Sequence, residues 1–442
     1  MKKPAFLDKI QYILDSLGYL DKAYERYGEN FKAPIIENNL FLISNPETLQ
    51  QIFTRDSQDI AAPRNPLLGI LTGDKSIFML DGAEHRRERK LLMPPFHGEG
   101  IFDYCQLIWE LTENAMASLT PGTSFIARDV MQSISIGVIL KAVFGIEEQN
   151  RFQELKQSMA TLVNSLQSPL ISSLLYLPAL RKDFGPNSPW RYFQNCKKNI
   201  DRLIYQEIRE RRQEQDSSGK KDILALLMSV EEETGAKMTD EELHDELLTL
   251  LLAGYETTAT AMSWGIYWIH RFPKVREKLR QELEELGETQ EPTAIIKLPY
   301  LTAVCNESLR IIPVTSLTFP RLIIKPIELG GEWLEQGTTV RGCIYLTHRR
   351  EDLYPDADQF KPERFLERKY SPYEFMPFGG GIRRCLGDVL ALLEMKLVLA
   401  KIISSYQLAL VDQEPVKPKR RGVIVAPGDG VKMIFQGGFR GI

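Results

Sequence analysis

The sequence predicts a mainly helical protein with a small β region. From about residue 86 to 310, apolar residues recur mostly at helical spacing, and only short polar interruptions separate the periodic stretches. Two other stretches, 34–46 and 321–340, contain short apolar runs around Asn-Asn and Gly-Gly pairs, which indicate hairpins. Because no interruption is long enough for a domain linker, we expect one domain over 1–442.

The bulk composition is that of an ordinary globular protein, with 43% hydrophobic and 26% charged residues. The 55 Lys and Arg residues are nearly balanced by 59 Asp and Glu residues, and a formal net charge of −4 does not fit a nucleic-acid binder. The five cysteines are scattered and form no C-x-x-C pair. We therefore expect a reducing compartment, the cytoplasm by default, rather than a disulfide framework.

The first 28 residues show apolar residues at helical spacing among charged ones, which predicts an amphipathic helix. We expect this helix to pack on the domain, and a helix lying on a membrane surface is the alternative. No apolar run there approaches the ~20 residues that a membrane span needs, and no signal-peptide core follows the first lysines. The sequence therefore predicts no transmembrane segment.

A long helix is predicted over 239–270. Thr239 and Glu242 form a capping box at its start, and a Phe-Pro pair closes it. Its middle, LLTLLLAG, is apolar on all sides and should run through the core. Polar residues, Glu256 and Thr257, nevertheless stand at that centre; on its own, such a threonine most simply bonds back to a carbonyl one turn earlier.

A further helix carries Glu307 and Arg310 on one face, which alone would suggest a surface ion pair. About thirty residues around 351–381 then show no clear periodicity, but their aromatic residues and prolines favour an ordered coil. The stretch VAPGDGVKMIF near the C-terminus predicts a last hairpin.

The segment PFGGGIRRCLG, at 377–387, runs three glycines into two arginines and a cysteine. It matches neither a phosphate-binding loop nor a dinucleotide fingerprint. A strong helix sequence follows Cys385, so the cysteine lies near a helix N-terminus, where the dipole favours a thiolate. Such a thiolate is a nucleophile or a metal ligand, and a buried structural cysteine is the plain alternative. The isolated cysteines and scattered histidines do not give the spacing of a zinc site.

The run FGGGIRRCLG resembles the haem-binding signature of the cytochrome P-450 family. The resemblance implies a single-domain P-450 fold with haem b (iron protoporphyrin IX) between the long central helix and the helix after the cysteine loop. Cys385 would be the proximal thiolate ligand of the iron. Phe378, Gly381 and Gly387 match the other positions of the signature, and Gly387 would let the haem plane lie close.

Other segments resemble further motifs of the family, in the family's order and over nearly the whole chain. Ala253 and Gly254 match the segment over the distal haem face, where Gly254 would make room for O2. Glu256 and Thr257, which follow, would then be the catalytic pair that relays protons for O2 cleavage. The residue implied as the axial ligand is again Cys385.

Four basic residues match the family's haem-propionate positions, namely His85, Arg89, Arg321 and Arg383. Glu307 and Arg310 match its E-x-x-R motif, and Arg364 in KPERF matches the arginine that pairs with it. The resemblance implies that this buried pairing holds the aperiodic coil beneath the haem.

The implied function is that of a haem-thiolate monooxygenase, which activates O2 and inserts one oxygen atom into a hydrophobic substrate. The sequence contains no reductase-like domain, so electrons would come from a separate ferredoxin or flavodoxin with its reductase, and we expect a monomer. A peroxygenase or isomerase of the same family is one alternative, but these branches generally lack the Glu256–Thr257 pair. A haem-thiolate sensor without turnover is another, but it would have no need of the pair.

The chain looks most similar to bacterial long-chain hydroxylases, so a fatty acid or an alkane is favoured over a terpenoid. The stretches implied to line the pocket, 66–80, 161–180 and 313–319, are apolar with few charges. Lys75 and Lys182 are the candidate anchors for a substrate carboxylate, although both also fit solvated loop positions.

Overall fold

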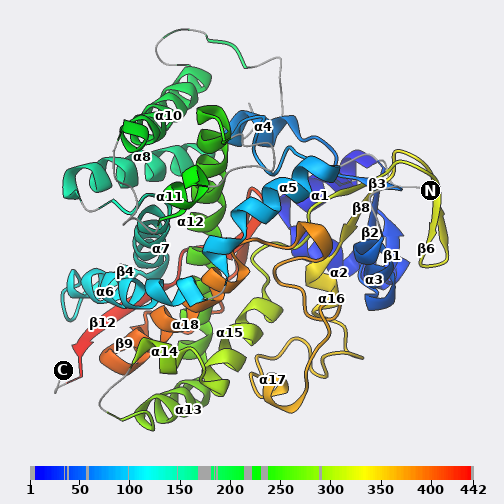
Figure 1. The fold of residues 1–442 in the computed structure, drawn as a ribbon. Helices are drawn as coiled ribbons and strands as arrows, with labels where there is room; N and C mark the ends of the chain where they lie inside the picture. Colours follow the sequence, from blue (N-terminus) through cyan, green and yellow to red (C-terminus); the bar gives the residue numbers. More distant parts are fainter. Residues whose placement is uncertain are drawn as a thin grey trace. The chain divides into compact units, whose positions relative to one another are not determined.

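The computed structural model describes the chain from residue 5 to 439, except for residues 34, 37–38, 56–58, 98, 147, 168–180, 184, 186–187, 214–221, 230–236 and 288–290. Helices dominate, and the strands are short (Figure 1). The residue contacts divide the chain into two compact units. Unit 1 comprises Met1–Pro63, Ile108–Met131 and Thr257–Ile442, and unit 2 comprises Arg64–Leu107 and Gln132–Glu256. Each unit is described by itself below.

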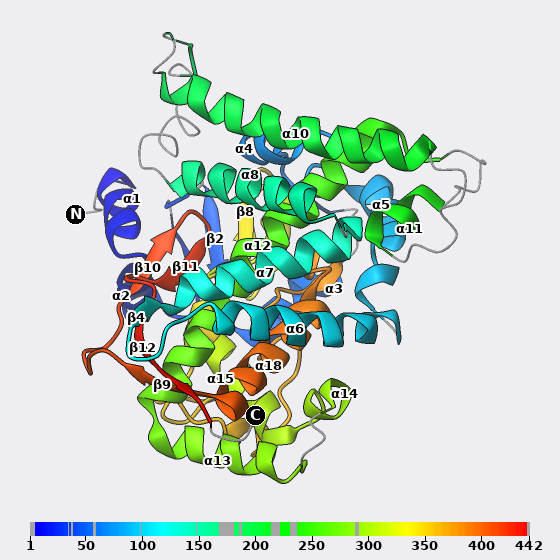
Figure 2. The same ribbon diagram turned by 90° about the vertical axis from the view of Figure 1, so that its left-hand side faces the viewer.

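Unit 2 is helical. Its helices include α4 (Pro66–Thr72), α5 (Gly82–Leu92), α8 (Gln149–Gln167), α10 (Pro189–Gln213) and α11 (Ile223–Ser229), with the 3₁₀ turns η1 (Pro94–Phe96) and η2 (Glu99–Phe102). Helices α8 and α10 lie side by side, as Figure 2 shows. Three helices, α6 (Asp103–Ala117), α7 (Ala127–Phe144) and α12 (Asp240–Arg271), continue from one unit into the other.

The long helix predicted from the sequence is α12. Thr239 caps it as expected: the backbone N–H of Glu242 donates to the Thr239 hydroxyl at 3.2 Å, and the Glu242 carboxylate accepts from the Thr239 N–H at 2.9 Å. The helix ends at Arg271, before Phe272, and Pro273 begins the next helix. The reciprocal cap and the proline stop therefore set both ends.

Unit 1 holds the remaining helices and the strands of the described residues. The helices are α1 (Ala5–Leu14), α2 (Ser16–Tyr27), α3 (Pro46–Thr54), α13 (Pro273–Glu284), α14 (Pro292–Ile295), α15 (Pro299–Ile311), α16 (Ile344–Thr347), α17 (Arg364–Glu367) and α18 (Asp388–Ser405), with the 3₁₀ turn η4 (Gly381–Arg383). The amphipathic N-terminal segment is thus two helices, and Tyr12, Tyr19 and Leu20 from them are buried in a cluster with Phe31 and Leu40.

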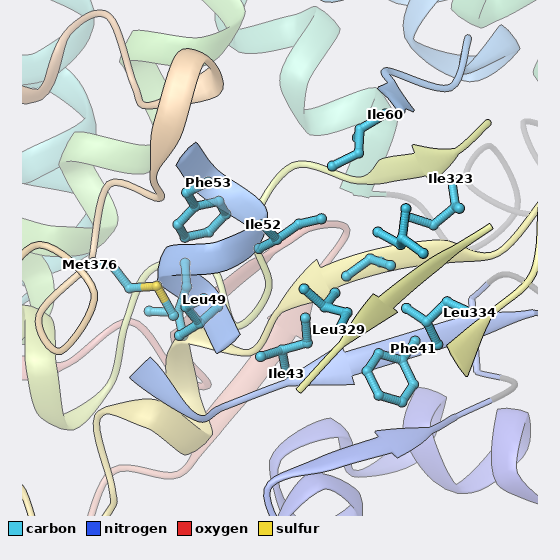
Figure 3. Packing of buried hydrophobic residues seen from close by; sticks show 13 residues of the cluster. Phe41, Ile43, Leu49, Ile52, Phe53, Ile60, Ile323, Leu329, Leu334 and Met376 are labelled. Carbon is cyan, nitrogen blue, oxygen red and sulfur yellow. The ribbon is translucent and has the colours of Figure 1, made fainter. Parts of the chain in front are cut away.

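A five-stranded sheet has the order β1-β2-β8-β5-β3, with β2 and β8 parallel and the other pairs antiparallel. Its strands are β1 (Asn30–Lys32), β2 (Leu40–Ile43), β3 (Ile60–Ala61), β5 (Arg321–Ile323) and β8 (Thr339–Gly342). One cluster joins the sheet to α3 and to the coil at Met376, which lies near Leu49 and Phe53 (Figure 3). This cluster places α3 next to the segment that leads into the cysteine loop.

The other sheets are small. Strands β6 (Ile327–Leu329) and β7 (Glu332–Leu334) form the hairpin predicted around the Gly-Gly pair, and Gly330 and Gly331 both have positive φ. Strand β12 (Lys432–Gly438) pairs with β4 (Ser124–Ile126) and β9 (Tyr406–Leu410). Strand β10 (Pro418–Arg421) pairs with β11 (Ile424–Pro427).

Two hairpin predictions need correction. The strand that pairs with β2 is β1, at Asn30–Lys32, and it lies before the predicted stretch 34–46, with the buried Phe31 opposite Leu42. The predicted C-terminal hairpin is wrong: β11 and β12 belong to different sheets. Both edges of β12 are already paired, with β4 and β9, so no edge is left for β11.

The sequence predicts no transmembrane segment, and the structure allows the described helices to be checked for one. None of them is both long enough and apolar enough to cross a bilayer.

Candidate active site

The cysteine loop of unit 1 is built on glycines. Gly379 and Gly381 adopt φ values of +72° and +64°, which favour glycine because a side chain there is strained. The backbone N–H of Cys385 donates to the carbonyl oxygen of Phe378 at 3.0 Å and closes the loop. Helix α18 then begins at Asp388, with Gly387 as its N-cap residue. Cys385 therefore lies just before a helix N-terminus, as the sequence predicts.

Close approach of α3 explains two of the three glycines, Gly380 and Gly381, whereas Gly379 is explained by its positive φ. A Cβ on Gly380 would lie 2.5 Å from the ring of Phe53, and a Cβ on Gly381 would lie 2.8 Å from the Phe53 carbonyl oxygen. Phe53 is buried in the cluster shown in Figure 3. The glycine run thus lets the loop pack directly on the end of α3.

Two of the predicted propionate arginines converge beside this loop. Arg321 is buried, and its guanidinium donates to the carbonyl oxygens of Phe319 at 3.1 Å and Gly380 at 3.2 Å. The Arg383 guanidinium lies 5.2 Å from the centre of the Phe319 ring. Both cations are therefore held next to the loop that carries Cys385.

These residues fit a flat, anionic prosthetic group. The Cys385 side chain is exposed, and a Cβ added to Gly387 would meet no atom within 4 Å, so open space lies where a side chain would stand. A thiolate ligand, a position without a side chain and two arginines are what haem with its propionates requires. Cys385 would hold the iron, and Arg321 and Arg383 would hold the propionates.

The coil before the cysteine loop is anchored by Arg310. Its guanidinium donates to both carboxylate oxygens of Glu307, at 2.7 and 2.9 Å, and to the carbonyls of His348, Ala357 and Gln359 at 2.8, 2.8 and 3.1 Å. All five N–H groups of the arginine are therefore used. Both side chains of the Glu307–Arg310 pair are fully buried.

Arg364 completes this network, and the pairing expected from the sequence is present. Its Nε donates to Glu307 at 3.2 Å, and its other nitrogens donate to the carbonyls of Pro355 and Asp356. The backbone N–H of Lys361 donates to the same Glu307 carboxylate at 2.8 Å. The buried carboxylate thus fixes the aperiodic segment at several points.

His348 links the network to the cysteine loop, a role that the sequence does not signal. Its Nε2 accepts the backbone N–H of Met376 at 2.9 Å, and the Met376 carbonyl accepts the N–H of Gly379. Burial, and then the neighbouring Arg310, lower the pKa of His348 to about 3. The ring therefore stays neutral and keeps its acceptor nitrogen near neutral pH.

In unit 2, the centre of α12 carries the predicted distal residues. Glu256 is buried, and its carboxylate accepts a hydrogen bond from Gln132 of α7 at 2.7 Å. A Cβ on Gly254 would lie 2.9 Å from Cδ1 of Ile139, so this glycine also permits the close packing of α7. Ala253 is partly exposed, and so is Thr257, the first residue of α12 that belongs to unit 1.

Helix α5 carries the other two predicted propionate residues. His85 is buried and Arg89 partly exposed, one turn apart on the same helix of unit 2. The candidate carboxylate anchors Lys75 and Lys182 are both exposed. Most of the predicted pocket stretch 161–180, its part from 168 on, lies outside the described residues.

Comparisons with known proteins identify the same family over nearly the whole chain. The family model described as "Cytochrome P450" matches residues 4–435. "Putative cytochrome P450 135A1" of Mycobacterium tuberculosis is 30% identical over 434 residues, covering 97% of this chain and 93% of the relative. "Putative cytochrome P450 135B1" of Mycobacterium bovis is 32% identical over 435 residues, covering 97% and 90%.

The fold agrees with a solved structure as well. "Retinoic acid bound cyanobacterial CYP120A1" superposes with a TM-score of 0.84 at 25% sequence identity, covering 97% of this chain and 96% of that one. Nearly the whole fold thus has a counterpart of known architecture. The chain therefore belongs to the cytochrome P450 family of haem-dependent monooxygenases.

Proposed function

We propose that Cys385 is the axial thiolate ligand of haem in a monooxygenase that hydroxylates a long apolar substrate. The observation that carries this proposal is the exposed Cys385 in a glycine loop whose arginines, Arg321 and Arg383, are held by fixed carbonyl and ring contacts. His85 and Arg89 are the other two propionate partners. The two compact units together form one monooxygenase domain over 1–442.

Bound haem supplies the iron at which O2 is reduced and cleaved, and a thiolate ligand favours that cleavage. The side chains of the protein deliver protons and hold the reacting groups in position. Glu256 takes up and releases a proton at its carboxylate, which Gln132 orients through the bond at 2.7 Å. Thr257 passes the proton on through its hydroxyl. Phe378, Gly381 and Gly387 shape the thiolate side, and Ala253 and Gly254 keep the distal side free of large side chains.

The substrate is proposed to be a fatty acid. The apolar stretches at 66–80 and 313–319 support a hydrophobic ligand, and Lys75 offers a cation for a carboxylate. A terpenoid acid is the second candidate, because the structural neighbour at 25% identity was solved with retinoic acid bound. Both candidates are long, apolar molecules with one carboxylate.

Electrons are proposed to come from a separate small acidic ferredoxin or flavodoxin with its reductase, and the enzyme is proposed to act as a monomer in the cytoplasm. Arg86, Arg87 and Lys90 of α5 are exposed, and basic side chains of this kind attract an acidic donor by long-range electrostatics. Raising the salt concentration should therefore slow the first electron transfer.

The decisive experiment is a carbon-monoxide difference spectrum of the reduced protein, with Cys385→His compared with wild type. We expect a strongly red-shifted Soret band in the wild type and its loss in the variant. Cys196→Ser is the matched control, because Cys196 is a partly exposed cysteine on α10, in the other unit. A histidine-type band in wild type, or a red-shifted band that survives Cys385→His, would refute the assignment of the ligand.

Turnover is tested with NADPH, a surrogate ferredoxin system and palmitate or retinoic acid as probes. Hydroxylated product from palmitate supports the fatty-acid proposal, and product from retinoic acid alone supports the second candidate. A red-shifted carbon-monoxide band without NADPH consumption would instead identify a haem-thiolate binding protein without turnover.

A further inference from the structure

Glu246 of α12 is a carboxylic acid buried without a side-chain partner among the described residues. Its exposed fraction is 0%, and neither carboxyl oxygen accepts a hydrogen bond of normal geometry there. The backbone N–H of Ile77 favours its charge, but less strongly than burial and Glu88 oppose it. An ionised carboxylate in such a place costs several kcal/mol unless it is paired. The helix cap is formed by Thr239 and Glu242 and does not involve Glu246.

The groups around Glu246 disfavour its ionisation further. Glu88 of α5 is also buried, and its charge acts on Glu246, as do those of Asp245 and Glu242 on the same helix. Burial first, and then Glu88, raise the pKa of Glu246 well above its usual value. Burial and the neighbouring carboxyls therefore both favour the protonated, neutral form of Glu246.

Glu246 lies on the same face of α12 as the residue that handles protons in the proposed function. At 3.6 residues per turn, Glu242, Glu246, Thr249 and Glu256 fall within roughly 80° of arc. The Thr249 hydroxyl lies 2.7 Å from the hydroxyl of Ser76, and both residues are buried. Polar groups thus occupy this face from the helix start to Thr249, and Glu256 follows on the same face two turns later, beyond the apolar run 250–252.

The outer end of this row reaches solvent. Glu242 is one-quarter exposed, and the half-exposed Arg87 of α5 lies 3.9 Å from its carboxylate and 3.6 Å from that of Glu88. This end of the row is therefore open to bulk water at Glu242, and Arg87 lies beside both Glu242 and Glu88. Protons from bulk water can enter at this point.

We propose that Glu246 is an internal proton donor that acts through Glu256, with Glu88 as the group that reloads it from solvent. The inference rests on the proposed role of Glu256. Glu246 is a relay residue and not a catalytic one, because ten residues, about 15 Å of helix, separate it from Glu256.

The proton balance is simple. The O–H bond of Glu246 breaks and its proton moves through the Thr249 and Ser76 hydroxyls and intervening water to the Glu256 carboxylate, which becomes neutral. Glu88 then protonates Glu246, and bulk water protonates Glu88 at the end near Arg87. Glu256 passes its proton on to the Thr257 hydroxyl and becomes a carboxylate again. One proton thus passes inward per cycle, no electrons move along this row, and every carboxyl returns to its starting state.

The first test needs no turnover. Infrared difference spectra of the haem-loaded wild type and Glu246→Gln, in H2O and D2O at neutral pH, should contain the carbonyl stretch of a protonated carboxyl. The band should shift in D2O and be lost in the variant. Its absence would overturn the proposal, because Glu246 would then be ionised. Glu241→Gln is the matched control, since Glu241 is an exposed acid on the same helix.

The second test measures coupling with NADPH, a surrogate ferredoxin system and palmitate. In Glu246→Gln we expect product formation to fall about 10-fold, with more hydrogen peroxide per NADPH and a larger solvent isotope effect. The fall stays below the ~10²–10⁴-fold of a directly acting acid because Glu256 remains. Glu246→Asp should restore part of the rate, and Glu241→Gln should match wild type.

Unchanged coupling and an unchanged solvent isotope effect in Glu246→Gln would overturn the relay, even if the infrared band were present and lost as expected. Failure of the proposed function itself looks different: the wild type would then lack the red-shifted carbon-monoxide band or would consume no NADPH. In that case the relay falls with the function, and the infrared spectra still report whether Glu246 is protonated.

Discussion

Replacing Arg310 by lysine tests whether the buried network holds the coil beneath the haem. Arginine has five N–H donors and lysine has three, so at least two of the five hydrogen bonds described above are lost. Lysine also cannot bind the Glu307 carboxylate with a planar fork. The fully buried carboxylate and the carbonyls of the coil would then lack donors.

The magnitude follows from these contacts. Breaking a buried ion pair costs ~3–5 kcal/mol, and each further carbonyl left without a donor adds ~1 kcal/mol or more. Total stabilities of folded domains are about 5–15 kcal/mol. We therefore expect Arg310→Lys to lose about 4 kcal/mol, enough to release haem at denaturant concentrations that the wild type tolerates.

The assay is urea unfolding, followed in parallel by circular dichroism and by haem absorbance. Arg280→Lys is the control: Arg280 forms an exposed pair with Glu284 at 3.8 Å, so its substitution should cost less than ~0.5 kcal/mol. If Arg310→Lys unfolds within about 1 kcal/mol of wild type, the network does not anchor the coil as argued.

Three further predictions follow from single contacts. Gly254→Val should lower the melting temperature through ~1–3 kcal/mol of overpacking, since a Cβ there lies 2.9 Å from its neighbour; an unchanged melt would contradict this. Gly381→Ala should lower the free energy of unfolding by more than ~1–2 kcal/mol and speed haem loss, because the residue at 381 has a φ of +64°. Haem retention equal to that of the wild type would count against this prediction. The ring nitrogens of His244 lie 2.9 Å from Asp245 and 3.1 Å from Asp201. Burial lowers the pKa of His244, but the hydrogen bonds to the two aspartates outweigh it and raise the pKa. The protonated His244 therefore stabilises the folded state fully below about pH 6.5, and this contribution is lost as the pH rises through the folded-state pKa. His244→Gln should flatten this pH dependence of the urea midpoint, and an unaltered slope would rule out the pairing of His244 with the two aspartates as its origin.

Motifs made of neighbouring residues predicted the ends of α12 and the place of the cysteine loop well. The capping box at Thr239 and the proline at 273 set the ends of α12, and the glycine run before Cys385 marked the loop and the helix after it. Each of these features depends on residues only a few positions apart, so it can be read along the chain. The pairing of Arg364 with Glu307 was predictable only through the resemblance to a family.

Long-range partners escaped prediction. Gln132 orients Glu256 from 124 residues away, and Phe53 shapes a loop more than 300 residues later, with no pattern that announces either contact. The C-terminal hairpin failed for the same reason, because the pairing of β12 is decided by which strand edges are available. The burial of Glu246 is equally hidden, since the sequence around it, DEELHDE, reads as a solvated acidic helix start.

The packing of Phe53 against Gly380 and Gly381 has a consequence for biosynthesis. The ribosome makes α3 early, but the loop that rests on it emerges only when most of the chain has been made. Contacts of such large sequence separation form slowly, because the intervening chain must be ordered first. Haem capture is therefore a late event that follows completion of nearly the whole polypeptide. A nascent chain that stops before residue 380 would contain all strands of the five-stranded sheet but would lack the cysteine loop that holds the cofactor.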